Sequence, residues 1–549
     1  MEKYSIGLDF GTLEARGMLV NQNGRIVKEA SYPYPHGVIS GELPDGTKIS
    51  GDLTLQDPRD YIKALHKIFS YLFDNDPGAA ERVIGIGIDF TQCTMMPIDK
   101  DGTPLCLLDT FKCNPYAYAK LWKHHGAGKQ SERMTEIAGE LGEEFLGWYG
   151  GTIYAESMFP KILETYEKCP EVYHAAGGFT ELADWMTFYL TGSKKRSESI
   201  AGCAALWNPQ NGYPSGGYLE ACSPGFGNVI KEKMDAELVK VGETAGYLKK
   251  NICEKYGFKE KIPVAAGIGD CQAGFIGVGL CEENILLSVS GTSSCDMLVD
   301  HRGIKIPGMY GVSCGSILPD YFGYEAGQAT MGDLYDWFLK NCVTESYFKE
   351  ADNRKISIFD YFNILVQDYH PDQTGLLVLD WWNGNRSVLL DTDLSGMILG
   401  MDMHTRCEDI YYALSEALAF GKRRIIEQFE AYDISIKKLY MTGGAANKNP
   451  FLMQLFADTT GLEVVIPNTE NGSCRGSALY GMISARYYNS FQQTVKKMQP
   501  GISKIYVPNR EYENIIDARY DMYCEMYQYF GRENKIMHVL KERKRGWQR

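Results

Sequence analysis

One short pattern occurs twice in this chain, once at its N-terminus and once near its middle. Residues 4–20 (YSIGLDFGTLEARGMLV) and residues 285–299 (ILLSVSGTSSCDMLV) each predict a strand, a Gly-Thr turn and a returning strand. A glycine at such a turn lets backbone N–H groups converge on an anion, and the threonine adds a hydroxyl. Two such hairpins in two halves of one chain predict a nucleotide held between two related domains.

Length and composition limit the classes of protein to consider. A chain of 549 residues exceeds what one hydrophobic core supports, which favours two large domains. Its net charge of −14 argues against a general nucleic-acid-binding protein. No apolar run is long enough to span a membrane, and the N-terminus enters a strand with no signal-peptide pattern. The 15 cysteines include no CxxC pair, which indicates reduced thiols in a cytoplasmic protein.

Strands that alternate with helices predict an α/β fold throughout the chain. We expect a first domain over residues 1–258, a second over 259–498 and a C-terminal helical extension over 499–549. Helices are expected near residues 58–73, near 408–432 and, in the extension, over 509–544. Nothing in the sequence sets the oligomeric state, so a homodimer stays open.

A strongly alternating strand over residues 83–89 ends on a carboxylate. Isoleucines occupy one face of this strand, whereas Gly85, Gly87 and Asp89 occupy the other. Glycines on one face of a strand indicate that another element packs very close to it. Asp89 lies at the carboxyl end of the strand, where open α/β sheets bind ligands.

Two further segments carry candidate chemistry. Gly443, Gly444 and Ala445 follow a strand and precede a helix that begins near Pro450, so a flat ring could approach this backbone. A plain strand-to-helix connection is the alternative, but the two hairpins favour an adenosine-binding turn. Asp270 stands after Gly269 at the start of a helix of small residues, either as a simple N-cap or as a general base beside a phosphoryl donor.

Together these motifs resemble those of the FGGY carbohydrate kinases, within the superfamily that also holds actin, hexokinase and Hsp70. The resemblance covers nearly the whole chain and implies two actin-like, ribonuclease H-like ATPase domains that flank an ATP cleft. It also implies transfer of the γ-phosphoryl group of ATP to a hydroxyl of a small sugar, with no nucleic-acid or membrane partner. Asp270 would be the catalytic base, and Asp9 would hold Mg²⁺, directly or through water.

The resemblance assigns the other candidate residues to two sites. The predicted ATP-binding residues are Gly11, Thr12, Arg16, Gly291, Thr292, Ser293, Gly443, Gly444, Ala445 and Asn449. For Arg16, a purely structural ion pair is an equal alternative. The predicted sugar-binding residues are Asp89, Gln92, Met96, Ala204, Asp270 and Glu325.

Within the family the chain resembles the ribulokinases most. The shared segments include Trp122-Lys123 with His125, Glu325-Ala-Gly-Gln328 and Asp380-Trp-Trp-Asn-Gly384 with Arg386. It departs from them at Ala204, where the ribulokinases have a lysine that faces the sugar. It departs again at Met95 and Met96, where they have small residues.

These departures change the expected hydrogen bonds around the sugar but leave the kinase chemistry intact. The expected substrate is a ribulose-like ketopentose, and the alternative is another ketose or polyol, such as D-ribulose, xylulose or a tetritol. A nonenzymatic ATP-binding switch of the same superfamily is a second alternative. The Gly269-Asp270 motif and the segment around Glu325 disfavour it, because a switch needs neither.

Overall fold

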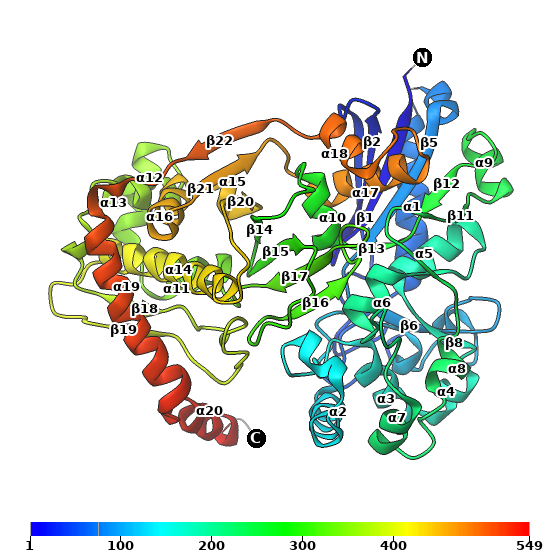
Figure 1. Ribbon diagram of the computed structural model, residues 1–549, viewed down its shortest axis with the longest axis horizontal. Helices are drawn as coiled ribbons and strands as arrows, with labels where there is room; N and C mark the ends of the chain where they lie inside the picture. Colours follow the sequence, from blue (N-terminus) through cyan, green and yellow to red (C-terminus); the bar gives the residue numbers. More distant parts are fainter. Residues whose placement is uncertain (1, 75, 548–549) are drawn as a thin grey trace.

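The two predicted hairpins lie at the centres of two separate sheets in two α/β domains (Figure 1). The computed structural model describes residues 2–74 and 76–547. The first sheet has the strand order β11-β12-β5-β1-β2-β3, and β13 also pairs with β5. Its strands are β1 Tyr4–Phe10, β2 Glu14–Asn21, β3 Ile26–Pro33, β5 Val83–Phe90, β11 Thr244–Tyr247, β12 Pro263–Ala265 and β13 Ile268–Gly269.

The second sheet has the order β16-β17-β15-β14-β20-β21-β22. Its strands are β14 Ile285–Ser290, β15 Ser294–Asp300, β16 Gly311–Cys314, β17 Phe322–Ala326, β20 Lys438–Thr442, β21 Glu463–Pro467 and β22 Ile502–Tyr506. In both domains an antiparallel hairpin, β1-β2 or β14-β15, is followed by parallel pairing of its first strand to β5 or β20. The shared topology confirms the prediction of two related domains, each built around one Gly-Thr hairpin.

Smaller sheets and helices surround these two sheets. A four-stranded sheet in the first domain joins β4 Leu55–Gln56, β7 Ala119–Lys120, β6 Met95–Ile98 and β8 Gly178–Glu181. Two-stranded sheets pair β9 Arg196–Ser197 with β10 Leu238–Val239, and β18 Leu377–Leu379 with β19 Met397–Leu399.

The helices of the first domain agree with the expected one at residues 58–73. They are α1 Pro58–Phe73, α2 Gly128–Leu141, α3 Met158–Lys168, α4 Pro170–Ala175, α5 Leu182–Thr191, α6 Glu198–Ala204, α7 Gly216–Cys222, α8 Val229–Lys233 and α9 Lys250–Tyr256. Asp57 caps α1 by accepting from the backbone N–H of Arg59, and Pro58 occupies its first turn.

The long helix expected near residues 408–432 is α14, Cys407–Glu430. The other helices after the first domain are α10 Asp270–Gly277, α11 Gly332–Asn341, α12 Glu345–Arg354, α13 Ile358–Val366, α15 Gly444–Lys448, α16 Pro450–Thr460, α17 Gly472–Ser484, α18 Phe491–Met498, α19 Glu513–Gln528 and α20 Ile536–Trp547.

Helix α17 comes from the second half of the chain but packs directly on the first sheet (Figure 1). A Cβ atom added to Gly7 would collide with the carbonyl of Cys474, and one added to Gly87 would collide with that of Ser477. The glycines of β1 and β5 therefore let the helix backbone approach the sheet backbone closely. This explains the glycine face predicted for residues 83–89.

Helix α10 crosses α17 with equally small residues at the contact. A Cβ atom on Gly277 would meet the carbonyl of Gly472, and one on Gly476 would meet that of Ala273. The two helices pack together between the sheets. They form the structural connection between the two domains.

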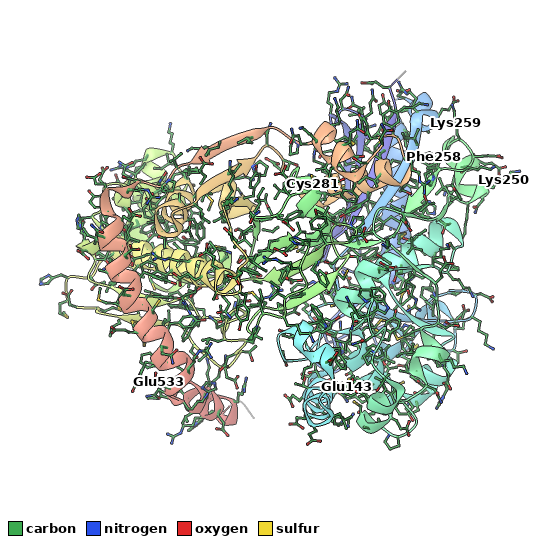
Figure 2. The ribbon with its side chains drawn as sticks, in the orientation of Figure 1. Glu143, Lys250, Phe258, Lys259, Cys281 and Glu533 are labelled. Atoms are coloured by element: carbon green, nitrogen blue, oxygen red, sulfur yellow. The ribbon has the colours of Figure 1, made fainter. Side chains whose placement is uncertain are left out.

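The first sheet extends past the expected border at residue 258, because β12 and β13 both pair with β5. Figure 2 shows Lys250, Phe258 and Lys259 at the outer edge of the first domain, whereas Cys281 lies between the domains. The chain thus passes from the first domain to the second after α10. The sequence pattern placed this border too early because a short parallel strand can return from far along the chain.

The C-terminal extension differs from the single helix expected over residues 509–544. Strand β22 joins the second sheet, and a π-helical turn at Tyr529–Glu533 separates α19 from α20. Gly531, a poor helix former, packs against Leu389 and Trp381 in this turn. The guanidinium of Arg519 in α19 donates twice to the buried carboxylate of Glu416, with both distances 2.7 Å, which fixes the extension to the second domain.

Among residues 2–74 and 76–547, no helix is both long and apolar enough to cross a membrane. All 15 cysteines lie in the described residues as free thiols; six of them are buried, and the other nine are exposed or partly exposed.

The close approach of α17 to the first sheet generates a stability prediction. We expect Gly87→Ala to lower the free energy of unfolding by at least about 3 kcal/mol, because the new methyl group meets backbone atoms that cannot rotate away. Gly51→Ala is the matched control, since its added Cβ meets nothing within 4 Å, and it should change stability by less than about 0.5 kcal/mol. Thermal unfolding followed by circular dichroism compares the two. Equal midpoints for the two variants would contradict the packing argument.

Candidate active site

Three carboxylates gather where neighbouring strands of the first sheet end. Asp9 and Asp89 are partners in the parallel pair β1-β5, and Asp270 begins α10 directly after β13. Strand β13 runs beside the end of β5, with Ile268 opposite Asp89. Because the carboxyl ends of parallel strands meet at one edge of a sheet, the topology brings all three acids to one place. We call these three residues the acid cluster.

Burial dominates the electrostatics of the acid cluster. Loss of hydration raises the pKa of Asp89 well above its ordinary value, and the charge of Asp9 raises it further. The pKa of Asp9 is also raised by burial, although Arg16 opposes this shift. For Asp270, loss of hydration and then the charge of Asp9 raise the pKa to about 7. A carboxyl group with this pKa can accept a proton near neutral pH.

Few partners compensate the acid cluster. Arg16 donates to Asp9 at 3.1 Å and to Glu14 at 3.0 Å, so the structural ion pair weighed for Arg16 is present. The hydroxyl of Ser477 in α17 donates to Oδ2 of Asp89 at 2.5 Å, whereas Oδ1 has no partner among the described residues. The backbone N–H of Cys271 donates to Oδ1 of Asp270 at 2.8 Å. The cluster therefore carries more acid than nearby cations can neutralise.

The first Gly-Thr turn joins β1 to β2, as predicted. The indole of Trp122 donates to Oγ1 of Thr12 at 3.1 Å, and the amide of Gln56 donates to the Thr12 carbonyl at 2.6 Å. The backbone N–H of Gly11 donates to the Glu14 carbonyl at 3.0 Å and closes the turn. These contacts hold the turn through the hydroxyl and carbonyl of Thr12 and the N–H of Gly11.

The second turn joins β14 to β15 and is held in a similar way. Backbone N–H groups at the start of α11 donate to its carbonyls, from Met331 to Thr292 at 2.9 Å and from Gly332 to Gly291 at 3.0 Å. Within the described part of the chain, the N–H groups of Thr292 and Ser293 donate to no protein acceptor. Free backbone donors at a turn tip are suited to an anion.

The Gly443 turn lies directly against the second hairpin. Gly443 has φ +92°, which favours glycine, and an added Cβ would collide with backbone atoms of Ser290 at the end of β14. Gly444 has open space around it and begins α15. The two motifs predicted to bind one nucleotide are therefore neighbours in space.

Asn449, a predicted ATP-binding residue, makes hydrogen bonds to protein groups with both ends of its amide. Its Oδ1 accepts from the backbone N–H of Leu452 at 3.0 Å, and its amide donates to the hydroxyl of Tyr411 at 3.0 Å. The side chain thus caps α16 inside the second domain, where it is 5% exposed. Both ends of the amide are already engaged, which indicates a structural role.

A narrow cavity of about 30 Å³ lies between the domains, beside the acid cluster. This is roughly the volume that one water molecule occupies in the liquid, so a sugar requires its walls to move apart. Its walls include Gln92 and Glu325 from the predicted sugar site. The other lining residues are Cys93, Tyr149, Tyr154, Ser157, Cys203, Gln272, Met297, Tyr310, Gly311, Ser313, Ser316, Ile317, Gly323 and Tyr324.

Contacts between the domains close this cavity. The rings of Tyr154 and Tyr310 stack with their centroids 4.0 Å apart, and the hydroxyl of Ser199 donates to the Ser316 carbonyl at 2.7 Å. Glu325 accepts from Arg386 at 2.6 Å. The guanidinium of Arg386 in turn lies 4.4 Å from the Tyr310 ring centroid. The ion pair of the second domain therefore contacts the aromatic stack that joins this domain to the first.

The structure places Met96, Ala204 and Asp89 away from the cavity walls in the described chain. Met96 is fully buried in the core of the first sheet, and Ala204 is fully buried at the end of α6. Their neighbours reach the cavity instead, since Gln92 precedes Met96 by four residues and Cys203 precedes Ala204. The sugar contacts expected from Met96 and Ala204 remain predictions, whereas Gln92 and Cys203 line this cavity.

Sequence reasoning missed several residues of this site. Cys203, Gln272 and Arg386 all lie inside quoted family motifs, but their types gave no reason to assign them a role. Tyr154 and Tyr310 had no local signal, because their stacking depends on the contact between the domains.

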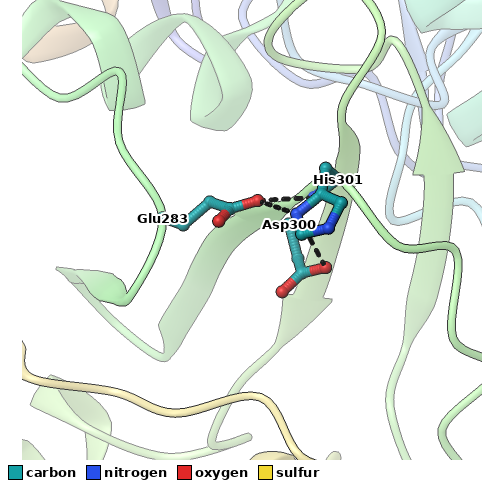
Figure 3. Close-up of side chains that lie close together, drawn as sticks. All are labelled: Glu283, Asp300 and His301. Carbon is teal, nitrogen blue, oxygen red and sulfur yellow. Dashed lines mark hydrogen bonds and ion pairs between the residues drawn. The ribbon is translucent and has the colours of Figure 1, made fainter.

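Within the described residues, one group offers the donor types of a metal site, namely Glu283, Asp300 and His301 (Figure 3). Its atoms are already paired with protein groups. The imidazole of His301 lies 2.6 Å from Glu283, and Asp300 accepts from Arg302 at 3.0 and 2.9 Å. The group also lies at the end of β14-β15 opposite the Gly291 turn, so it belongs to the frame of the second domain.

Two α/β domains of matching topology thus flank a buried acid cluster and a closed cavity. The family model described as "FGGY family of carbohydrate kinases, N-terminal domain" matches residues 4–277, and the corresponding C-terminal domain matches residues 286–485. The chain therefore belongs to the FGGY family of carbohydrate kinases, and it is an enzyme of that class.

Relatives and solved structures agree with this assignment. The chain is 40% identical to the ribulokinase of Bacillus licheniformis over 538 residues, which cover 97% of this chain and 98% of the relative. It is 38% identical to that of Halalkalibacterium halodurans over 98% of this chain and 97% of the relative. The ligand-bound xylulose kinase of Lactobacillus acidophilus has a TM-score of 0.79 at 16% identity, with 97% and 99% of the two chains covered. At this identity the structural likeness establishes the fold alone.

The raised pKa of Asp270 generates a prediction about stability and pH. The folded protein retains a proton on Asp270 that the unfolded chain releases between about pH 4 and pH 7, so the stability contribution of this group falls as pH rises through that range. Asp270→Asn removes this titration but can keep the bond from the Cys271 N–H. We expect the variant to gain thermal stability relative to the native chain, and to gain more at pH 8 than at pH 5. A difference in melting temperature that stays constant across this range would contradict the raised pKa.

Proposed function

We propose that this carbohydrate kinase transfers the γ-phosphoryl group of ATP to a hydroxyl of a ribulose-like ketopentose. The observation that carries the proposal is the position of Asp270 in the acid cluster, two residues before Gln272 in the cavity wall, where burial raises its pKa to about 7. Full-length similarity to proteins named ribulokinases supports the ketopentose as acceptor. A role in carbohydrate catabolism follows from this substrate.

Each part of the site takes one role in the proposed reaction. The substrate hydroxyl donates its proton to Asp270 as its oxygen attacks the γ-phosphorus. The N–H groups and hydroxyls of Thr12, Thr292 and Ser293, at the Gly11 and Gly291 turns, hold the phosphates. The turn at Gly443-Gly444-Ala445 receives the adenosine, while Arg16 stays paired with Asp9 until the phosphates enter.

The acid cluster fits a bound Mg²⁺ ion. Oxygen donors are the ligands that magnesium prefers, and Oδ1 of Asp89 is a buried oxygen without a partner in the described chain. Asp9 would hold the ion, directly or through water, with Asp89 behind it. When bound, Mg²⁺ would neutralise the charge of the phosphates beside these acids.

A second ketose or a polyol is the alternative acceptor. It is favoured by the neutral residues Cys203 and Ala204, because the ribulokinases have a lysine in this segment. Structures named xylulose kinase and glycerol kinase share the fold, but their identity of 16% gives no weight to either sugar.

Removal of the base tests the mechanism. We expect Asp270→Asn to lower kcat by about 10²- to 10⁴-fold, because the attacking hydroxyl then loses its proton acceptor. Calorimetric titration should show unchanged ATP affinity, which separates loss of chemistry from loss of folding. Asp393→Asn, on an exposed ion pair with Arg545, is the control and should leave turnover unchanged. Near-normal turnover in Asp270→Asn would exclude Asp270 as the base.

A substrate panel tests the acceptor. The native enzyme is assayed for ADP release with L-ribulose, D-ribulose, D-xylulose, erythritol and glycerol under identical conditions. We expect the highest kcat/KM with a ribulose, because the near relatives by sequence carry that name. A higher value with xylulose or a polyol would replace the ketopentose proposal with its alternative, and no sugar-dependent ADP release would overturn it.

A further inference from the structure

Two carboxamide oxygens converge immediately before the proposed base. A Cβ atom added to Gly269 would collide with Oε1 of Gln272 and would also lie in close contact with Oε1 of Gln92. Gly269 is the residue directly before Asp270, and both glutamines line the interdomain cavity. The absence of a side chain at position 269 therefore leaves room for two hydrogen-bond acceptors next to the base.

Gln272 is buried without complete hydrogen bonding. Its side chain is 3% exposed, and its Oε1 has no partner among the described residues. Buried polar atoms are almost always paired, because an unpaired acceptor forfeits its hydrogen bonds to water. An orphaned acceptor in the wall of a substrate cavity indicates a donor supplied by the ligand.

Cys203 fixes the orientation of this amide. Nε2 of Gln272 lies 3.8 Å from Sγ of Cys203, within hydrogen-bonding range of a sulfur acceptor. Cys203 belongs to α6, which Ser199 ties to the second domain through its bond to the Ser316 carbonyl. With its nitrogen held by sulfur, the amide turns its oxygen toward Gly269 and the base.

We propose that Gln272, oriented by Cys203, determines sugar specificity by accepting a hydrogen bond from a substrate hydroxyl beside the one that Asp270 deprotonates. Gln92 supplies a second acceptor to the same part of the sugar. This inference rests on the proposed function and deepens it.

The chemistry of the wall defines the class of substrate. Two amide oxygens together with the carboxylates of Asp270 and Glu325 form an acceptor-rich surface, and the guanidinium of Arg386 is already paired with Glu325. Such a surface binds a neutral sugar or polyol with adjacent hydroxyl donors. It repels a sugar acid, and it rejects an analogue that lacks the hydroxyl, because the Gln272 oxygen then stays buried and unpaired.

The test compares the favoured sugar of the panel with its monodeoxy analogues. Gln272→Met keeps the length of the side chain but removes the acceptor, and Gln367→Met, at an exposed position, is the matched control. For the native enzyme we expect kcat/KM for one analogue to be about 10⁴-fold below that of the sugar. Gln272→Met should shrink this ratio by about 100-fold or more, through loss on the parent sugar alone, with ATP affinity unchanged.

A second pair of variants keeps the inference falsifiable if Gln272→Met fails to fold. Cys203→Ser retains an acceptor for the amide and should preserve the ratio, whereas Cys203→Val removes it and should lower the ratio. Equal losses on the sugar and on every analogue, or an unchanged ratio in Gln272→Met or, where that variant does not fold, in Cys203→Val, would overturn the inference while the proposed function stands. A native enzyme without activity on any sugar would instead overturn both.

Discussion

The contact between backbone atoms of α17 and the first sheet is the constraint on which the rest of this structure depends. Because Gly7 and Gly87 carry no side chains, the helix lies close enough for Ser477 to reach Asp89. The same helix crosses α10 through small residues, and α10 begins with Asp270. A single packing arrangement therefore positions Asp270, the proposed base, buries the acid cluster and joins the two halves of the chain.

Burial of three carboxylates at one place opposes folding, and the structure offsets this cost only in part. Arg16 is the cation paired with Asp9, and raised pKa values allow Asp89 and Asp270 to hold protons where their charges would be most costly. A site of this kind gains most from a cation, and anionic phosphates can approach these acids only when their charge is neutralised. The electrostatics thus agree with a kinase in which metal and nucleotide enter together.

Local patterns in the sequence predicted a large part of the fold. The two hairpins and α1 are set by strand alternation, turn glycines and a capping motif within a few residues, and all of them are present. The domain border and the break after α19 depend on distant partners, namely the pairing of β12 and β13 with β5 and the packing of Gly531 on Trp381. A pattern of neighbouring residues in the sequence cannot predict contacts with residues far along the chain.

The same distinction explains the candidate site. Asp89 and Asp270 were proposed from their positions at a strand end and at a helix start, whereas Asp9 and Glu325 were assigned from the family resemblance. Met95 and Met96 are both buried on opposite faces of β6, because this strand lies between two hydrophobic cores. Period-two alternation cannot reveal a strand with two apolar faces.

The division of charge across the cavity indicates how the sugar site is assembled. The first domain contributes neutral groups, among them Gln92, Tyr154 and Cys203, whereas the Glu325-Arg386 pair comes from the second. The Tyr154-Tyr310 stack joins the two domains across the cavity, which at about 30 Å³ is too small to admit a sugar. Substrate must therefore enter an open form, and closure then completes the hydrogen-bonding groups around it. In the proposed reaction this order would suppress hydrolysis of ATP, because the second domain completes the site only after the acceptor has displaced water.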